Sequence, residues 1–203
     1  MSTRLCAARS LQTLVIASSY SGDTPEVVQA FRQAGERGAK LIGISTGGTI
    51  SALCRKYRAP HFSIAYGAQA RAALGYLVVP LISVLNRLSI IEVSRFDDVI
   101  DLVTSALRVA CDRYRPPVPT NQNPAKQLAE ALNDQLPLVV GSTTLWSVVK
   151  RWQFAFAQNA HVFAVADEVH TSLYTTLEGM TFPPALTQSI VVVQLRSHYD
   201  DPA

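Results

Sequence analysis

The sequence has few charged residues, few cysteines and no long uninterrupted apolar run, and each shortage excludes a class of protein. Charged residues make up 16% of the 203 positions and hydrophobic residues 48%, which is too apolar for a disordered chain. The cysteines, Cys6, Cys54 and Cys111, are odd in number and lack metal-ligand spacing, so we expect a reducing, cytoplasmic environment and no metal. Glycine, proline, asparagine and arginine interrupt the longest apolar stretch, residues 72–91. We therefore expect neither a secretory segment nor a membrane span.

The basic residues form no run long enough to follow a nucleic-acid backbone. Eighteen lysines and arginines are scattered among fifteen acidic residues, which leaves a net charge of +3. This pattern argues against nucleic acid as a partner. A mildly basic balance suits a small anionic ligand, and it equally suits an ordinary solvated surface.

Short apolar runs alternate with helical patterns along the first half of the chain. Residues 14–17 read as a strand, and Val27, Val28, Phe31 and Ala34 recur at helical spacing after a polar turn. The same order repeats with a strand at 40–44, a helix at 50–57 and a strand at 61–66. This alternation predicts an α/β fold with doubly wound, mainly parallel sheets flanked by helices.

Proline marks the expected domain boundary. Two long helices are expected at 69–91 and 96–113, and residues 116–124 then contain four prolines, which neither continue a helix nor enter a central strand. We therefore predict a first domain at 1–115, a linker at 116–124 and a second domain at 125–203. The second domain is expected to repeat the first in kind, and its expected elements are helices at 124–132 and 145–159 and strands at 137–140, 161–166 and 189–194.

The turn after the first strand carries the clearest chemical signal. Ser19, Ser21 and Thr24 lie between a strand and a helix, Gly22 permits close backbone approach, and Pro25 stands where a missing N–H costs nothing. Hydroxyls, amide N–H groups and the positive end of a helix dipole then converge, as a phosphate dianion requires. The alternative is that Thr24 only caps its helix.

A second polar turn follows the next strand. Ser45 and Thr46 precede two glycines, and parallel strands bring both turns to the same edge of the sheet, where ligands of such sheets bind. We expect Ser45 and Thr46 to share the phosphate site, although a glycine-rich turn is often only a turn. Neither loop carries the lysine of a P-loop or a complete dinucleotide fingerprint.

Three blocks in this order resemble the bifunctional phosphoglucose/phosphomannose isomerase family. They are residues 19–26 (SYSGDTPE), 45–48 (STGG) and 69–76 (QARAALGY), and the likeness continues through 123–126 (NPAK) and 149–152 (VKRW). The resemblance implies two SIS (sugar isomerase) units, a homodimer and no cofactor. It also implies interconversion of glucose 6-phosphate or mannose 6-phosphate with fructose 6-phosphate through an enediol.

The resemblance also assigns roles to single residues. Ser19, Ser21 and Thr24 grip the phosphate, and Arg71 stabilises the enediolate, a sensible role for a fixed positive charge. In the family a glutamate takes the proton, but here residues 157–161 read AQNAH and Gln158 stands at its position. An amide cannot accept this proton.

Glu168 and His170 are the candidate substitutes for the missing base, and on a strand they would share a face. They stand roughly where the family has its own histidine-containing block. Compared with the family, the first unit lacks the opening strand and its glycine-rich turn, and the second is shortened at its end. The alternative function is a non-catalytic phosphosugar-binding or regulatory module.

Overall fold

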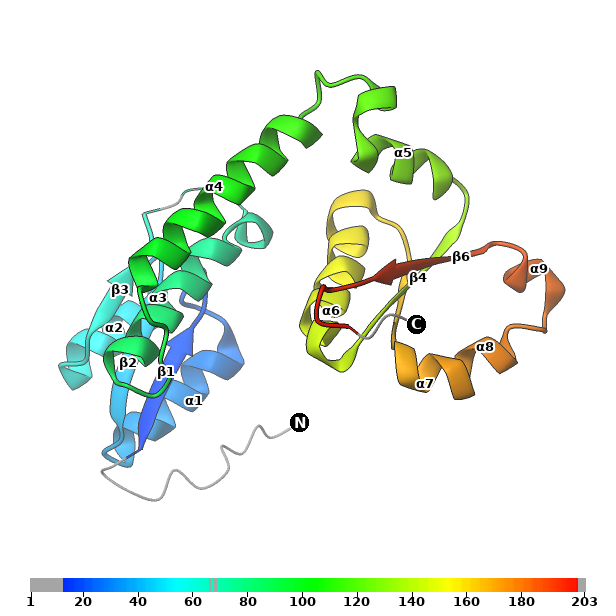
Figure 1. The fold of residues 1–203 in the computed structure, drawn as a ribbon. Helices are drawn as coiled ribbons and strands as arrows, with labels where there is room; N and C mark the ends of the chain where they lie inside the picture. Colours follow the sequence, from blue (N-terminus) through cyan, green and yellow to red (C-terminus); the bar gives the residue numbers. More distant parts are fainter. Residues whose placement is uncertain (1–12, 66, 68, 201–203) are drawn as a thin grey trace. The chain divides into compact units, whose positions relative to one another are not determined.

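A computed structural model describes residues 13–65, 67 and 69–200, so Cys6 and Tyr66 lie outside the described part. The chain divides into two compact units, one ending at Ile100 and the other beginning at Asp101 (Figure 1). The division falls inside helix α4 (Phe96–Tyr114). The domain limits expected from the proline-rich segment stay a prediction. Within the described residues, no helix is both long and apolar enough to cross a bilayer.

The first unit is built on a three-stranded parallel sheet in the order β1–β2–β3. Its elements in chain order are β1 (Leu14–Ser18), α1 (Pro25–Glu36), β2 (Lys40–Ser45), α2 (Gly48–Tyr57), β3 (His61–Ser63), the 3-10 helix η1 (Ala70–Ala72), α3 (Leu74–Arg87) and the start of α4. The parallel pairing places Val15 beside Leu41 and Gly43 beside His61. The carboxyl ends of all three strands therefore meet at one edge, where the polar turns lie.

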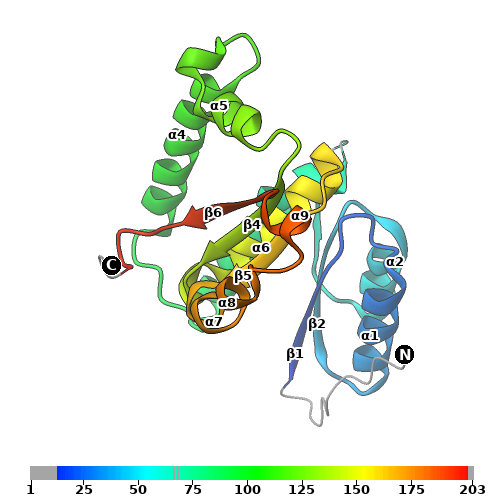
Figure 2. The ribbon, with the colours of Figure 1, turned by 90° about the vertical axis from the view of Figure 1, so that its right-hand side faces the viewer.

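Helices α1 and α2 cover one face of this sheet (Figure 2). The apolar positions of α1 recur at helical spacing and bring Phe31 and Ala34 into contact with Ala17 of β1, while Ile50 of α2 completes the same cluster. Phe31 and Ile50 are fully buried. Burial of side chains of this size contributes roughly 1.5–3 kcal/mol each, so this packing holds both helix N-termini at the sheet edge.

The second unit also has a three-stranded parallel sheet, in the order β5–β4–β6. After α4 its elements are η2 (Thr120–Gln122), α5 (Pro124–Ala131), β4 (Leu136–Gly141), η3 (Thr143–Leu145), α6 (Trp146–Ala155), a π turn η4 (Phe156–Ala160), β5 (Val165–Glu168), α7 (Val169–Tyr174), α8 (Thr176–Gly179), α9 (Pro184–Thr187) and β6 (Ile190–Leu195). Strand β4 is central and nearly all buried. Its two neighbours come later in the chain on opposite sides, so the order reverses at β4.

The expected fold class is confirmed, three of the expected elements differ in their bounds, and three short helices were missed. Strand β3 ends at Ser63 instead of continuing to Ala65, and the helix expected at 69–91 is a short 3-10 turn followed by α3. Strand β5 begins at Val165 because His161 has a left-handed backbone (φ 55°) that ends the preceding turn. Helices α7, α8 and α9 were not expected, since elements of four to six residues carry no readable period.

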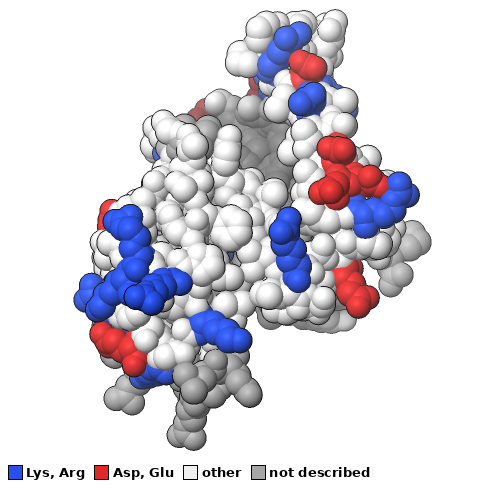
Figure 3. Space-filling view, turned by 90° about the vertical axis from the view of Figure 1, so that its left-hand side faces the viewer, with Lys and Arg blue, Asp and Glu red and all other residues white. Residues whose placement is uncertain are grey.

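Charged side chains on the face drawn in Figure 3 form small groups of either sign. One source of positive charge is the C-terminal end of α2, where Arg55 and Lys56 lie in the last turn and Arg58 caps the helix. Cations there interact favourably with the helix dipole. These basic residues therefore have a structural role that needs no ligand.

Candidate functional site

The turn between β1 and α1 is held together by its own hydroxyls. Ser19 is buried, and its Oγ lies 2.8 Å from the Oγ1 of Thr24. The Gly22 N–H donates to the Ser19 carbonyl (3.1 Å) and to Ser19 Oγ (3.2 Å). The Asp23 N–H donates to Ser21 Oγ (3.2 Å). Ser21 Oγ is thus an acceptor within the turn and can direct its own hydrogen outward.

Thr24 precedes α1, but its side chain makes no hydrogen bond to the helix backbone. The interpretation of Thr24 as a simple helix cap is therefore wrong, because its hydroxyl bonds Ser19 instead. The first turn of a helix has N–H groups without intrahelical acceptors; Pro25 has no N–H, so in α1 these belong to Glu26 and Val27. The turn presents hydroxyls beside the positive end of a helix dipole, which is a geometry that binds anions.

Glycine is required at position 22 by the conformation of its own turn and by the close approach of the neighbouring turn. Its φ is 77°, and a Cβ there would lie 2.1 Å from the carbonyl oxygen of Gly47. Gly48 is the counterpart, because a Cβ there would lie 2.5 Å from the carbonyl oxygen of Ser21. The two turns interlock through positions where only glycine fits.

The hydroxyls of the second turn have partners inside the protein. Ser45 is fully buried; its Oγ donates to the Gly47 carbonyl (2.8 Å) and lies 2.8 Å from Nε2 of His61. Thr46 Oγ1 donates to the Tyr20 carbonyl (2.8 Å), and so does the Thr46 N–H (2.8 Å). Thr46 therefore supports the first turn directly, whereas Ser45 holds Gly47 of the second turn, and contact of either side chain with a ligand stays a prediction.

The N-terminus of α2 already holds an anion that belongs to the chain. The Asp23 carboxylate accepts hydrogen bonds from the Thr49 N–H (2.8 Å) and the Thr49 hydroxyl (2.7 Å). These two bonds, the hydroxyl bond first, lower the pKa of the Asp23 carboxyl below its ordinary value. Of the two helices that start at this edge, α2 is thus capped by a carboxylate, whereas α1 begins at the hydroxyls of Ser19, Ser21 and Thr24.

Arg71 lies in η1, in the segment that leaves β3. It is exposed. Because β3 runs parallel to β1 and β2, this segment leaves the same edge of the sheet as the two polar turns. The segment that leads to Arg71 thus starts from the edge that carries the predicted phosphate turn, and a shared site of the two stays a prediction.

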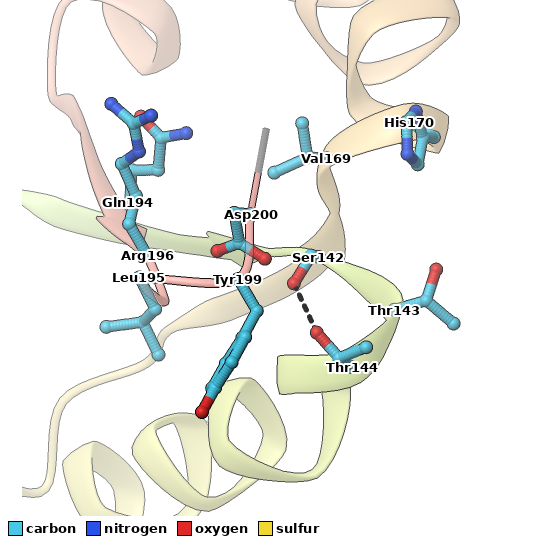
Figure 4. Close-up of a pocket in the computed structure, with 10 residues that line it drawn as sticks. All are labelled: Ser142, Thr143, Thr144, Val169, His170, Gln194, Leu195, Arg196, Tyr199 and Asp200. Carbon is cyan, nitrogen blue, oxygen red and sulfur yellow. Dashed lines mark hydrogen bonds between the residues drawn. The ribbon is translucent and has the colours of Figure 1, made fainter. Parts of the chain in front are cut away.

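The second unit has a cavity of about 430 Å³, with both polar and apolar groups in its lining, at the carboxyl edge of its own sheet (Figure 4). It is lined by Ser142, Thr143, Thr144, Val169, His170, Gln194, Leu195, Arg196, Tyr199 and Asp200. These residues come from the ends of all three strands and the segments that follow them. The cavity lies where the strand order reverses, the usual position of a ligand pocket in such sheets.

Carboxylates approach the hydroxyls of this cavity. Thr143 Oγ1 donates to Glu168 Oε1. Ser142 Oγ lies 2.9 Å from Thr144 Oγ1, and Figure 4 shows the Asp200 carboxylate facing Ser142. The Ser197 N–H and, next in effect, the Ser142 hydroxyl lower the pKa of the Asp200 carboxyl. In this turn the hydroxyls thus interact with carboxylates of the same chain.

The candidate bases are placed differently from the expectation that they share a strand face. Glu168 is the last residue of β5, whereas His170 lies in α7 and lines the cavity. Gln158 is exposed in the π turn that follows α6, at the opposite end of that helix from Ser142. The second unit therefore places Glu168 and His170 at the carboxyl edge of its sheet and Gln158 at the amino edge.

Sequence reasoning missed several polar residues of these sites. Asp23 and His61 contact the second turn, and the turn at 142–144 lines the cavity together with Arg196. The available signal for the last group was a Ser-Thr-Thr turn after a strand, the same pattern as in the first unit. Within the described part of the chain, no three His, Cys, Asp or Glu side chains come together as metal ligands.

Comparison with known proteins finds relatives that are named as sugar-phosphate isomerases. Residues 121–203 match the family model of the bacterial phospho-glucose isomerase C-terminal SIS domain. The bifunctional phosphoglucose/phosphomannose isomerase of Caldicellulosiruptor bescii is 39% identical over 190 residues, which cover 93% of this chain and 56% of that protein. The enzyme of the same name from Thermoplasma acidophilum is 30% identical over 155 residues, 76% of this chain and 44% of that protein. The chain thus spans about half the length of these relatives.

The fold is also found among solved structures. A Clostridium difficile 630 protein assigned as a phosphosugar isomerase superposes with a TM-score of 0.67 at 13% identity, over 93% of this chain and 53% of that one. At this identity the likeness concerns the fold alone. The sequence matches show that the chain belongs to the SIS-domain family of the bifunctional phosphoglucose/phosphomannose isomerases.

Proposed function

We propose that the chain binds the phosphate of a hexose 6-phosphate at the N-terminus of α1 and takes part in aldose–ketose isomerisation of that sugar. The observation that carries this proposal is the arrangement of Ser19, Ser21 and Thr24 beside a helix N-terminus, while Asp23 turns away to cap α2. A phosphate dianion supplies acceptor oxygens and negative charge together, and this turn supplies the complementary hydrogens and the positive end of a dipole.

The proposed reaction moves one proton between neighbouring carbons. A base removes a proton from the carbon beside the carbonyl, the resulting enediolate carries negative charge on oxygen, and reprotonation at the other carbon completes the exchange. No net oxidation occurs, so the proposed chemistry needs no redox cofactor. Glucose 6-phosphate and mannose 6-phosphate differ only at the carbon that loses its proton, so both lead to the same enediol and to fructose 6-phosphate.

Arg71 is the proposed stabiliser of the enediolate, since its charge is permanent and its planar fork suits oxygen pairs. Glu168 and His170 are the proposed proton-transfer residues, either in the same chain or contributed by a partner subunit. Their support is their position at the carboxyl edge of the second sheet, where His170 lines the cavity. Gln158 is exposed in the turn after α6 and carries an amide, which does not take up a proton at neutral pH. The proposal includes a homodimer in the cytoplasm, in line with the resemblance described above.

The experiment combines turnover with binding. The purified chain is mixed with fructose 6-phosphate, and glucose 6-phosphate is detected by a coupled dehydrogenase, while thermal unfolding is recorded with and without the sugar phosphate. At one hundred times the dissociation constant the ligand is expected to add about 2.7 kcal/mol to the free energy of unfolding. Thr24→Val is expected to reduce this stabilisation, and Glu168→Gln or His170→Gln to reduce turnover only.

The outcomes separate the functions. Stabilisation by sugar phosphate without turnover in a folded preparation makes the chain a phosphosugar-binding module. Absence of stabilisation by fructose 6-phosphate, glucose 6-phosphate and inorganic phosphate contradicts the phosphate site and with it the proposal. If the Thr24→Val variant is fully active and its affinity is unchanged, the assignment of the phosphate site to this turn is wrong.

A further inference from the structure

A chain of hydrogen bonds leads from His61 to the interlocked turns. His61 is the first residue of β3 and pairs with Gly43 of β2, which places its ring beside the end of β2. Its Nε2 lies 2.8 Å from the Oγ of Ser45, which is fully buried. Ser45 Oγ in turn donates to the carbonyl of Gly47 at 2.8 Å. Three residues of the sheet edge are thus linked in series.

The hydrogens of this series can be assigned by counting them. A serine hydroxyl has one hydrogen, and a carbonyl oxygen accepts but never donates. The Ser45 hydrogen therefore goes to the Gly47 carbonyl, and Ser45 Oγ meets His61 as an acceptor. Nε2 of His61 must then carry a hydrogen. The series reads from the His61 N–H to Ser45 and from the Ser45 O–H to Gly47.

Gly47 packs directly against the phosphate turn, residues 19–24. Its carbonyl oxygen fills the space where a Cβ on Gly22 would stand, at 2.1 Å from that point. The Gly22 carbonyl accepts from the Ile50 N–H at 2.9 Å, and the Thr46 N–H donates to Tyr20 at 2.8 Å. A shift of Gly47 therefore displaces Gly22, which lies between Ser21 and Asp23 in the turn.

We propose that His61 is a positioning residue for the phosphate turn, which it holds in place through Ser45 and Gly47. The inference rests on the proposed function, because it assigns His61 to the same phosphate site. His61 itself lies behind that site and does not touch the ligand. Besides Ser45 of β2, the titratable or charged groups recorded near the ring belong to α2: Arg55, and Cys54, whose Sγ shares the surroundings of Gly43 with the His61 ring.

The environment of the ring favours its neutral form, in which only one ring nitrogen carries a hydrogen. Burial first, and the nearby Arg55 charge second, lower the pKa of the His61 imidazole. The neutral ring has a single hydrogen, and the assignment above places it on Nε2. A neutral ring with its hydrogen on Nδ1 leaves Ser45 facing two acceptors with one hydrogen, and one of the two buried contacts is lost.

The test compares two substitutions of the same residue. His61→Phe keeps a planar ring and removes the donor, whereas His61→Gln keeps an N–H donor at a similar reach. His198→Phe, at an exposed position in the second unit, is the matched control. Affinity for fructose 6-phosphate and for inorganic phosphate is measured by calorimetry at pH 7.5. We expect about tenfold weaker binding for His61→Phe, the value of one typical hydrogen bond, and nearly wild-type binding for His61→Gln and His198→Phe.

Each result decides the question. Wild-type affinity in folded His61→Phe overturns the inference, and so does His61→Gln binding as weakly as His61→Phe. Failure of the wild-type protein to bind either probe refutes the proposed function itself, which is a different result. Nitrogen-15 NMR of the wild-type imidazole gives a readout that needs no variant: a hydrogen on Nε2 supports the series, and a hydrogen on Nδ1 overturns it.

Discussion

The turn before α1 and the turn before α6 look alike in sequence and differ in the charges that face them. Both follow a parallel strand, and both contain a pair of hydroxyls in contact, Ser19 with Thr24 and Ser142 with Thr144. In the second unit Glu168 accepts from the adjacent Thr143, and Asp200 faces Ser142. In the first unit Asp23, which lies in the turn itself, bonds Thr49 at the start of α2 instead, and Glu26 is the acidic residue in the first turn of α1.

This difference teaches that a hydroxyl-rich turn is not enough to identify a phosphate site. Hydroxyls and helix N-termini attract whichever anion is available, and a carboxylate from the same chain competes with one from solution. The direction in which the nearest acidic side chain points is therefore the more informative feature. This direction distinguishes the N-terminus of α1 from those of α2 and α6, although all three helices begin at a polar turn.

The largest effect is expected from giving the first turn the charge that the second already has. Ser21→Asp places a carboxylate at an exposed position beside the ligand phosphate. Because like charges at close range cost several kcal/mol, we expect at least a 100-fold loss of affinity for fructose 6-phosphate. Thr144→Asp is the control in the second unit and should leave the affinity unchanged. Equal losses in both variants would erase the proposed distinction between the turns.

A smaller effect is expected from the glycines that end or follow the two strands. Gly22→Ala introduces a Cβ against the Gly47 carbonyl at a positive φ, and we expect a loss of about 1–3 kcal/mol in unfolding free energy together with weaker phosphate binding. Gly141→Ala meets Cγ2 of Val149 at 2.7 Å and should destabilise by a similar amount without changing affinity. Calorimetry of unfolding and of binding measures both quantities.

Gly75→Ala is the control for the alanine substitution itself. This glycine is the second residue of α3 with nothing within 4 Å of the added carbon, so the change should stabilise the protein by at most the value for a helix interior, about 0.5–1 kcal/mol. Preserved phosphate affinity in Gly22→Ala would contradict the interlocking of the turns.

The smallest effect is expected at Asp23, and it depends on pH. The pKa of this carboxyl is lower in the folded protein than the ordinary 3.8, so its bonds to Thr49 stabilise the protein fully above that value. The contribution is lost as the pH falls through the lowered folded-state pKa. We expect Asp23→Asn to melt a few degrees below the wild type at pH 7 and the gap to close in strong acid. A gap that persists unchanged down to pH 2 would show that the carboxylate charge is not the cause.

The sequence predicts the elements whose signals are local. Strand β1 and helix α1 follow from an apolar run, Pro25 and the spacing of Val27, Val28 and Phe31, and the structure has both at the expected place. The position of Ser19, Ser21 and Thr24 at a strand-to-helix junction follows from the same signals. Helix α5 begins at Pro124, as expected, and Asn123 caps it by accepting from the N–H groups of Ala125 and Lys126.

What the sequence does not predict depends on contacts between elements. The bond between Asp23 and Thr49 joins two turns, and the pair Ser45 and His61 requires the register of β2 against β3. No periodic pattern encodes either. Glu168 ends a strand and His170 lies in a helix because β5 stops between them. The exact end of a strand is among the features that a sequence pattern predicts least reliably.

The central position of β4 also governs how the cavity of the second unit opens. Its backbone is hydrogen-bonded to a neighbour on each side, whereas β5 and β6 are each paired on one side only within this sheet. Local unfolding starts where a strand has the fewest bonds to break, so amide hydrogens of β4 should exchange with solvent last. The turn at 142–144 is anchored to this persistent strand, while His170, Arg196 and Asp200 are carried by segments that follow the peripheral ones. Local unfolding should therefore remove His170, Arg196 and Asp200 from the cavity before it displaces the turn at 142–144.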